Sequence, residues 1–201
     1  YTFPTEQQFA DKAHASDVAA IFLKELLRNG TTTALVFGSV HPQSVDAFFE
    51  QADKLNLRMI AGKVLMDRNA PDYLTDTAET GYAESKALIE RWHGKGRLHY
   101  AVTPRFAPTS TPQQLELAGK LLGEYPDLYM HTHLSENRKE IEWVKALFPE
   151  RKGYLDVYDH HRLIGPRAVF AHGVHLCDEE CQRLAETGSA VAFCPTSNPF
   201  L

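Results

Sequence analysis

Cysteine is scarce in this sequence, with only three in 201 residues. Cys177, Cys181 and Cys194 are odd in number and contain no C-x-x-C pair. Secreted domains that depend on disulfides usually carry an even and denser set of cysteines. The sequence therefore argues against a disulfide framework and favours a reducing, cytoplasmic compartment. We expect all three cysteines to be structural thiols rather than metal ligands.

Long apolar runs, basic runs and glycine-rich phosphate loops are also lacking. No stretch approaches the length of a membrane span, and no secretory signal opens the chain. The formal net charge of −5 argues against nucleic acid or an anionic membrane as the main partner. No G-x-G-x-x-G or P-loop motif follows any predicted strand, which weakens a nucleotide-binding fold.

What the sequence does contain is an alternation of strand-like and helical segments. The predicted strands cover residues 31–37, 58–66, 98–106, 129–134, 168–176 and 189–194. The predicted helices cover residues 19–28, 42–55, 113–122, 138–147, 155–163 and 178–186, with one more ending near residue 94. Such apolar strands are typical of a parallel sheet covered by helices. An open doubly wound sheet and a (β/α)8 barrel both fit, and length alone favours the open sheet, because a full barrel takes about 250 residues.

Polar side chains gather where the predicted strands end, and they favour the barrel. The set comprises Lys63, Asp67, Arg68, Arg105, His133, Glu136, His172, His175 and residues 196–198. Barrel enzymes place their working residues in the loops that follow the strands. Burying such groups unpaired costs roughly 2–7 kcal/mol each, so they must bind each other, a metal or a ligand.

The sharpest motif is His131-Thr132-His133-Leu134-Ser135-Glu136. The period of two puts His131 and His133 on one face of the strand. Imidazole nitrogens suit zinc or iron, and Glu136 past the strand end could carry a proton from a metal-activated water. The alternative is that both histidines fill the core and Glu136 favours the start of the next helix. The strand context favours the functional interpretation.

Two further strand ends carry candidate residues. His172 is polar within an apolar run, at the strand end one unit after His133, whereas His175 and His41 are read as ordinary core histidines. Arg105 beside Phe106 suits a flat heterocycle with a carbonyl group, through forked hydrogen bonds and stacking. A salt bridge at the rim is an equally good reading of Arg105.

Five segments resemble the guanine deaminases of the amidohydrolase superfamily, and the similarity runs the full length of the chain. They are Gly62-Lys63-Val64-Leu65-Met66-Asp67-Arg68-Asn69, Thr103-Pro104-Arg105-Phe106-Ala107-Pro108, His131-Thr132-His133-Leu134-Ser135-Glu136-Asn137, Ala171-His172-Gly173 and Cys194-Pro195-Thr196-Ser197-Asn198. The third and fifth are shared with other amidohydrolases, while the first two are more particular to guanine deaminases.

The resemblance implies a partial (β/α)8 barrel of the metal-dependent hydrolase type. His133 would bind the single catalytic zinc, for which iron is the alternative because it accepts the same ligands. Glu136 would move the proton from zinc-bound water to departing ammonia, and His172 would face the water and the substrate. Arg105 and Phe106 would hold guanine, which is converted to xanthine in purine catabolism. The zinc deaminases with H-x-E and P-C-x-x-C are unrelated. The resemblance further implies a homodimer.

The sequence departs from the family pattern at both ends. An H-x-H motif on the opening strand would precede Tyr1, and a metal-binding aspartate would follow Leu201. We therefore expect residues 1–201 to be a single incomplete catalytic barrel domain, about strands two to seven, that is inactive alone. Two alternatives are an amidohydrolase acting on a pterin or triazine, and a truncated, non-catalytic purine-binding module.

Overall fold

Strands and helices alternate in the order that the sequence predicts. A computed structural model describes residues 2–200. The strands are β1 (Thr33–Phe37), β2 (Arg58–Gly62), β3 (Val64–Leu65), β4 (His99–Pro104), β5 (Tyr129–Leu134), β6 (Ala168–His172) and β7 (Ala190–Ala192). The α-helices are α1 (Thr2–Gln7), α2 (Lys12–Arg28), α3 (Pro42–Lys54), α4 (Ala78–Trp92), α5 (Pro112–Glu124), α6 (Arg138–Leu147), α7 (Tyr154–His160) and α8 (Asp178–Thr187). Short 3-10 turns are η1 (Gln8–Ala10), η2 (Asp72–Leu74), η3 (Ala107–Thr109) and η4 (Asn198–Phe200).

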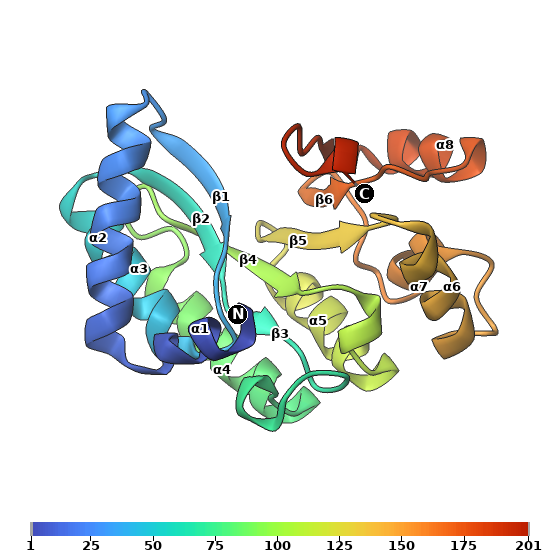
Figure 1. Cartoon of the computed structure of the whole chain (residues 1–201), viewed down its shortest axis with the longest axis horizontal. Coiled ribbons are helices and arrows are strands. Elements are labelled where there is room, and N and C mark those ends of the chain that lie inside the picture. Colours follow the sequence, from blue (N-terminus) through green and yellow to red (C-terminus); the bar gives the residue numbers. More distant parts are fainter. Residues whose placement is uncertain (1, 201) are drawn as a thin grey trace.

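The sheet is parallel throughout, in the order β1-β2-β4-β5-β6-β7, with β3 pairing β4. Each strand follows its predecessor around the sheet, whereas a doubly wound sheet reverses its order at a switch point. Figure 1 shows the sheet curled into a half-barrel with the helices on its outer side. The predicted partial barrel is therefore confirmed, and the open doubly wound sheet is not.

The hydrophobic core lies between the outer face of the sheet and the helices. Tyr100 of β4 and Phe170 of β6 are fully buried in it, together with Phe49 of α3 and Leu115 of α5. Burying one such side chain stabilises the fold by roughly 1.5–3 kcal/mol. The outward-facing residues of the strands are thus used for packing. The inward-facing residues and the strand ends are left for the site.

The strand predicted over residues 58–66 divides into β2 and β3 at Lys63. Gly62 passes so close to β4 that a Cβ atom there would collide with the carbonyl oxygen of Ala101. The amide of Lys63 then donates to the hydroxyl of Tyr100 at 3.1 Å instead of to a neighbouring strand. Pairing resumes where Val64 lies beside Thr103. Only glycine permits this close approach.

Two further differences concern the ends of strands, and a third is an additional helix and turn at the start of the described residues. β6 stops at His172 rather than near residue 176, because His172 and Gly173 have φ angles of 76° and 59°, which extended strands do not adopt. β7 covers only the middle of the predicted last strand. The helix α1 and the turn η1 precede every predicted element. None of the helices within residues 2–200 is long and apolar enough to cross a bilayer.

Candidate active site

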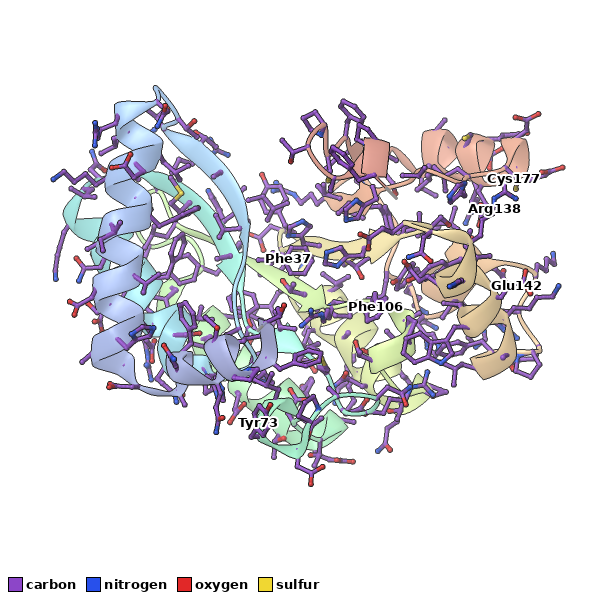
Figure 2. The ribbon with its side chains drawn as sticks, viewed as in Figure 1. Phe37, Tyr73, Phe106, Arg138, Glu142 and Cys177 are labelled. Carbon is purple, nitrogen blue, oxygen red and sulfur yellow. The ribbon has the colours of Figure 1, made fainter. Side chains whose placement is uncertain are left out.

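The predicted site residues meet at the carboxyl ends of β4, β5 and β6. The rings of His133 and His172 stack, with 5.4 Å between centroids and 20° between planes. Nε2 of His172 lies 3.6 Å from Oε1 of Glu136. Phe106 meets the ring of His133 nearly at right angles, with 6.5 Å between centroids. Figure 2 shows that Phe106 and Phe37 of β1 both lie on the inner side of the half-barrel.

His133 is held in one tautomer by the main chain of the loop after β4. Its Nδ1 lies 2.7 Å from the carbonyl oxygen of Arg105, and because a carbonyl only accepts, Nδ1 carries the proton. Burial lowers the pKa of His133, and His172 lowers it further, against the opposing effect of the bond to Arg105. The ring is therefore neutral at pH 7, with the lone pair of Nε2 available to a metal.

His172 sits on a strained backbone and is fixed by a residue from beyond β7. Its φ of 76° is rare for a residue with a side chain and costs of order 1–3 kcal/mol. Nδ1 of the ring lies 2.9 Å from Oδ1 of Asn198, and Nδ2 of Asn198 lies 3.5 Å from the carbonyl oxygen of His172. Asn198 thus accepts from Nδ1 and leaves Nε2 directed at Glu136. Ser135, just before Glu136, also has a positive φ, of 49°.

Arg105 makes the salt bridge that the sequence left open, and it does so inside the molecule. Its Nη1 lies 3.3 Å from Oε2 of Glu6 in α1, and its guanidinium lies 5.9 Å from the ring centre of Phe3. Both charged side chains are largely shielded, at 29% and 16% exposure for Arg105 and Glu6. A guanidinium has five donors, so this contact orients Arg105 and still leaves donors for a ligand.

His131 shares the inner face with His133 but does not join the other site residues. Its ring packs on Phe37 with 4.1 Å between centroids, and Phe37 also lies against His133 at 4.5 Å. Burial lowers the pKa of His131 to about 3, and its buried Nδ1 has no hydrogen-bond partner among the described residues. The predicted shared face of His131 and His133 is confirmed.

Three strand-end residues from the first resembling segment serve the framework instead. Lys63 is fully buried and its Nζ lies 2.6 Å from Oδ2 of Asp76 and 2.8 Å from the carbonyl oxygen of Val40. Asp67 accepts hydrogen bonds from the amide and hydroxyl of Thr111, at 2.7 and 2.5 Å. The guanidinium of Arg68 covers the ring of Phe148 at 5.0 Å. The Asp67 bonds tie the loop after β3 to the loop after β4, the Arg68 contact ties it to the end of α6, and Lys63 joins it to Val40 in the loop after β1.

The remaining histidines and the cysteines stay outside the site. His41 begins α3, and burial lowers its pKa, with Lys63 adding to the effect. The amide of His175 donates to the carbonyl oxygen of Ser135 at 3.2 Å. The three cysteines are free, as expected, but Cys177 and Cys181 are exposed and are not core residues.

The metal that the resemblance implies can be tested against the donors present. His133 fits one ligand position, because its ring is neutral and its tautomer is fixed with the lone pair on Nε2. Within residues 2–200, no group of three histidine, cysteine or carboxylate side chains is close enough to hold a metal ion. His133 therefore fits as a single ligand of a larger set.

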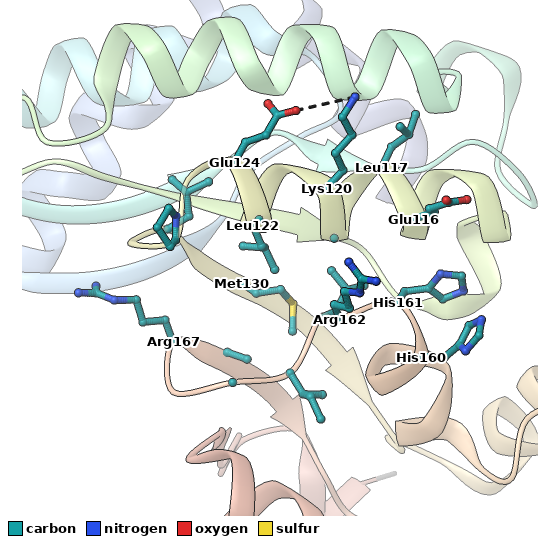
Figure 3. Close-up of a pocket in the computed structure, with 18 of the residues that line it drawn as sticks. Glu116, Leu117, Lys120, Leu122, Glu124, Met130, His160, His161, Arg162 and Arg167 are labelled. Atoms are coloured by element: carbon teal, nitrogen blue, oxygen red, sulfur yellow. Dashed lines mark ion pairs between the residues drawn. The ribbon is translucent and has the colours of Figure 1, made fainter.

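A groove elsewhere has no part in this site. It has a volume of about 1010 Å³ and lies between α5 and the segment that joins α7 to β6, as Figure 3 shows. Leu122, Met130 and Leu163 form apolar parts of its wall, and Lys120 pairs with Glu124 at its rim. None of the predicted site residues lines it.

Sequence reasoning missed the contributions of Glu6, Phe37 and Asn198. Asn198 belonged to a resembling segment but had no role assigned to it. Glu6 lies 99 residues before Arg105, so no spacing could connect the two. Phe37 ends an apolar strand and looks like any other core residue. Its position at the end of a strand, next to Gly38, was the only sequence feature that could have placed Phe37 near the site.

Known proteins resemble the chain over its whole length. Residues 3–201 match the amidohydrolase family. The guanine deaminase of Escherichia coli (strain K12) is 63% identical over 201 residues, which are 100% of this chain and 46% of that protein. The guanine deaminase of Mus musculus is 40% identical over 202 residues, covering 98% of this chain and 44% of that protein. The chain thus spans about half the length of these relatives.

Solved structures give the same result for the fold. The E. coli guanine deaminase superposes with a TM-score of 0.98 at 63% identity, over 99% of this chain and 46% of that one. A guanine deaminase from C. acetobutylicum with bound guanine in the active site has a TM-score of 0.95 at 34% identity, over 98% and 48%. With its half-barrel, its strand-end histidines and a match from residue 3 to residue 201, the chain belongs to the amidohydrolase family.

Proposed function

We propose that the full-length gene product hydrolyses guanine to xanthine and ammonia. The observation that carries this proposal is the meeting of His133, Glu136 and His172 with the Arg105–Phe106 loop at one edge of the half-barrel. The 63% identity to a guanine deaminase and the likeness to a guanine-bound relative support the choice of substrate. Water adds at C2 of the purine, the C2–NH2 bond breaks, and the products are the 2-oxo compound and ammonia.

The metal in this proposal is zinc, one per site, with iron as the alternative because it takes the same ligands. His133 would hold it through Nε2, and the other ligands would come from outside residues 2–200. When bound, such an ion lowers the pKa of a water ligand toward 7 and so supplies a nucleophile at neutral pH. A lone histidine cannot bind zinc tightly, so residues 1–201 alone would be inactive.

The side chains of this chain have distinct tasks in the proposed reaction. Glu136 takes the proton of the attacking water on a carboxylate oxygen and returns it to the leaving amine. His172, 3.6 Å from Glu136, faces the attacking water and the leaving amine and stabilises the charge that develops on them. Arg105 donates to a purine carbonyl, and Phe106 gives the ring an apolar contact surface. These assignments rest on geometry and on the family resemblance together.

The wider setting is also proposed. We place the protein in the cytoplasm as a homodimer of purine catabolism, with guanine as its small-molecule partner and without nucleic acid or membrane partners. The three free cysteines suit a reducing compartment. The net charge of −5 gives no electrostatic attraction for polyanions.

The test is a substrate comparison with the full-length gene product. Guanine, a pterin and an aminotriazine would be offered separately, and xanthine and ammonia would be quantified. We expect xanthine from guanine, with a higher kcat/KM than for either competitor. Preference for the pterin or triazine would support the alternative amidohydrolase. Tight purine binding without turnover would support the non-catalytic module instead, and either result would end the proposal.

A further inference from the structure

The hydroxyl of Tyr158 in α7 joins the two halves of the candidate site. It accepts from the amide of Ala107 at 2.9 Å and donates to the carbonyl oxygen of His133 at 2.8 Å. The hydroxyl of Thr132 lies 3.1 Å from it. A phenol has one proton to donate and can accept twice, so all of its capacity is used. Tyr158 itself is fully buried.

We propose that Tyr158 is a positioning residue that sets the Arg105–Phe106 loop relative to His133. This inference rests on the proposed function, in which that loop holds the purine. Ala107 directly follows Phe106, so its amide fixes the point where the loop leaves the site. Tyr158 touches no reacting atom in this proposal and acts only through the loop.

The opposite end of the loop is bonded to the same strand. The carbonyl oxygen of Arg105 accepts from the amide of His133 at 3.2 Å and from its Nδ1 at 2.7 Å. The loop is therefore attached to β5 at two points. Arg105 bonds to His133 directly, and Ala107 is joined to His133 through Tyr158. Without the second attachment, the amide of Ala107 would be a buried donor with no partner, which folded proteins avoid. The loop would shift to satisfy it.

The ring of Tyr158 is fixed well enough to serve as a reference point. It packs on Tyr154 with 5.6 Å between centroids and on Phe170 with 5.7 Å. Phe170 lies in β6, beside β5, so the ring is anchored to the sheet that carries His133 and His172. A phenylalanine at position 158 would keep this packing and lose only the hydroxyl.

Tyr154 provides a matched control. It lies one turn earlier in α7 and is also buried, and its hydroxyl interacts with Glu140 and Tyr158 but makes no hydrogen bond to Ala107 or His133 among the described residues. Tyr154→Phe therefore removes the same group from the same helix and leaves the bonds of the Tyr158 hydroxyl to Ala107, Thr132 and His133 in place. Thr132→Val gives a second, milder variant, because the Thr132 hydroxyl contacts both Tyr158 and the carbonyl oxygen of Arg105.

The experiment measures kinetics and hydrogen exchange on the full-length gene product. Tyr158→Phe should raise KM for guanine about tenfold, change kcat less, and leave the metal content unchanged, since a lost buried hydrogen bond weakens binding by roughly that factor. Amides of residues 105–109 should exchange faster. Thr132→Val should move both readouts in the same direction by less, and Tyr154→Phe should move neither.

An unchanged KM and unchanged exchange in Tyr158→Phe would overturn the inference, as would an equal effect in Tyr154→Phe. If Tyr158→Phe does not fold, the same two readouts on Thr132→Val decide the matter. If the parent protein makes no xanthine, the proposed function fails, while the exchange of residues 105–109 still reports whether Tyr158 holds the loop.

Discussion

Nδ1 of His172 lies 2.9 Å from Oδ1 of Asn198, which fixes the ring so that Nε2 faces Glu136. The two residues are 26 positions apart, and η4 brings Asn198 back under the end of β6. An imidazole that carries its proton on Nδ1 presents a lone pair at Nε2. The pair His172–Glu136 can therefore share one proton. The proposed deamination needs such a proton on its way from the attacking water to the leaving amine.

Replacing Asn198 by alanine should lower kcat about tenfold or more, because the lost acceptor frees the His172 ring to rotate. Steady-state kinetics of the full-length gene product measure the change. Ser197→Ala is the control, since among residues 2–200 the Ser197 hydroxyl bonds only to the carbonyl oxygen of Cys194 in the same turn. Equal kinetics for Asn198→Ala and the parent would show that Asn198 does not orient His172.

Glu6→Gln should raise KM for guanine several-fold and change kcat little. The substitution removes the charge that holds the Arg105 guanidinium at 3.3 Å, and the pair is partly screened by solvent. Glu50→Gln breaks a comparable pair with Lys12 on the exposed surface and should leave KM unchanged. A loss confined to kcat in Glu6→Gln would contradict the role given to Arg105.

The strand order and the position of the histidines could be predicted from the sequence, whereas the long-range side-chain contacts could not. The alternation of apolar segments predicts a parallel sheet with crossover helices, and the polar residues at the strand ends favour the barrel over the open sheet. The period of two within β5 places His131 and His133 on one face. The roles of Glu6 and Tyr158 could not be predicted, because the residues that they contact are distant in the sequence. A tyrosine among apolar helix residues looks the same whether its hydroxyl is used or not.

The loop after β3 shows a different limit of sequence reasoning. Lys63, Asp67 and Arg68 stand at strand ends, as site residues do, yet their partners are Asp76, Thr111 and Phe148. Strand-end position selects residues near the site without distinguishing those that contact a ligand from those that hold the loops. Only the three-dimensional partners separate the two groups.

Lys63→Met should destabilise the protein by about 3–5 kcal/mol, because it leaves Asp76 buried without its cation. Burial raises the pKa of Asp76 and Lys63 opposes that rise, so the carboxyl would take up a proton in the variant. Urea unfolding measures the loss. Lys86→Met, which breaks an exposed pair with Glu124, should leave the midpoint close to that of the parent. Equal midpoints for both variants would contradict this account.

Stability should fall as the pH falls below about 6.5. Burial lowers the pKa of His41, His99 and His161, so the folded protein keeps these rings neutral while the unfolded chain takes up protons near the ordinary histidine pKa of about 6.5. Their contribution is complete above that pH and is lost below it. Urea midpoints at a series of pH values test this, and His161→Gln should make the slope shallower. A midpoint that rises on acidification would be inconsistent with the buried histidines.

The most direct test of the central claim is Glu136→Gln in the full-length gene product, with turnover and bound metal measured on the same sample. The amide keeps the shape of the carboxylate but cannot carry a proton. We predict that xanthine formation falls by about 10²–10⁴-fold while the metal content per chain stays at the parent value. Retained turnover, or loss of metal together with activity, would contradict the role of Glu136 as the proton carrier beside His172.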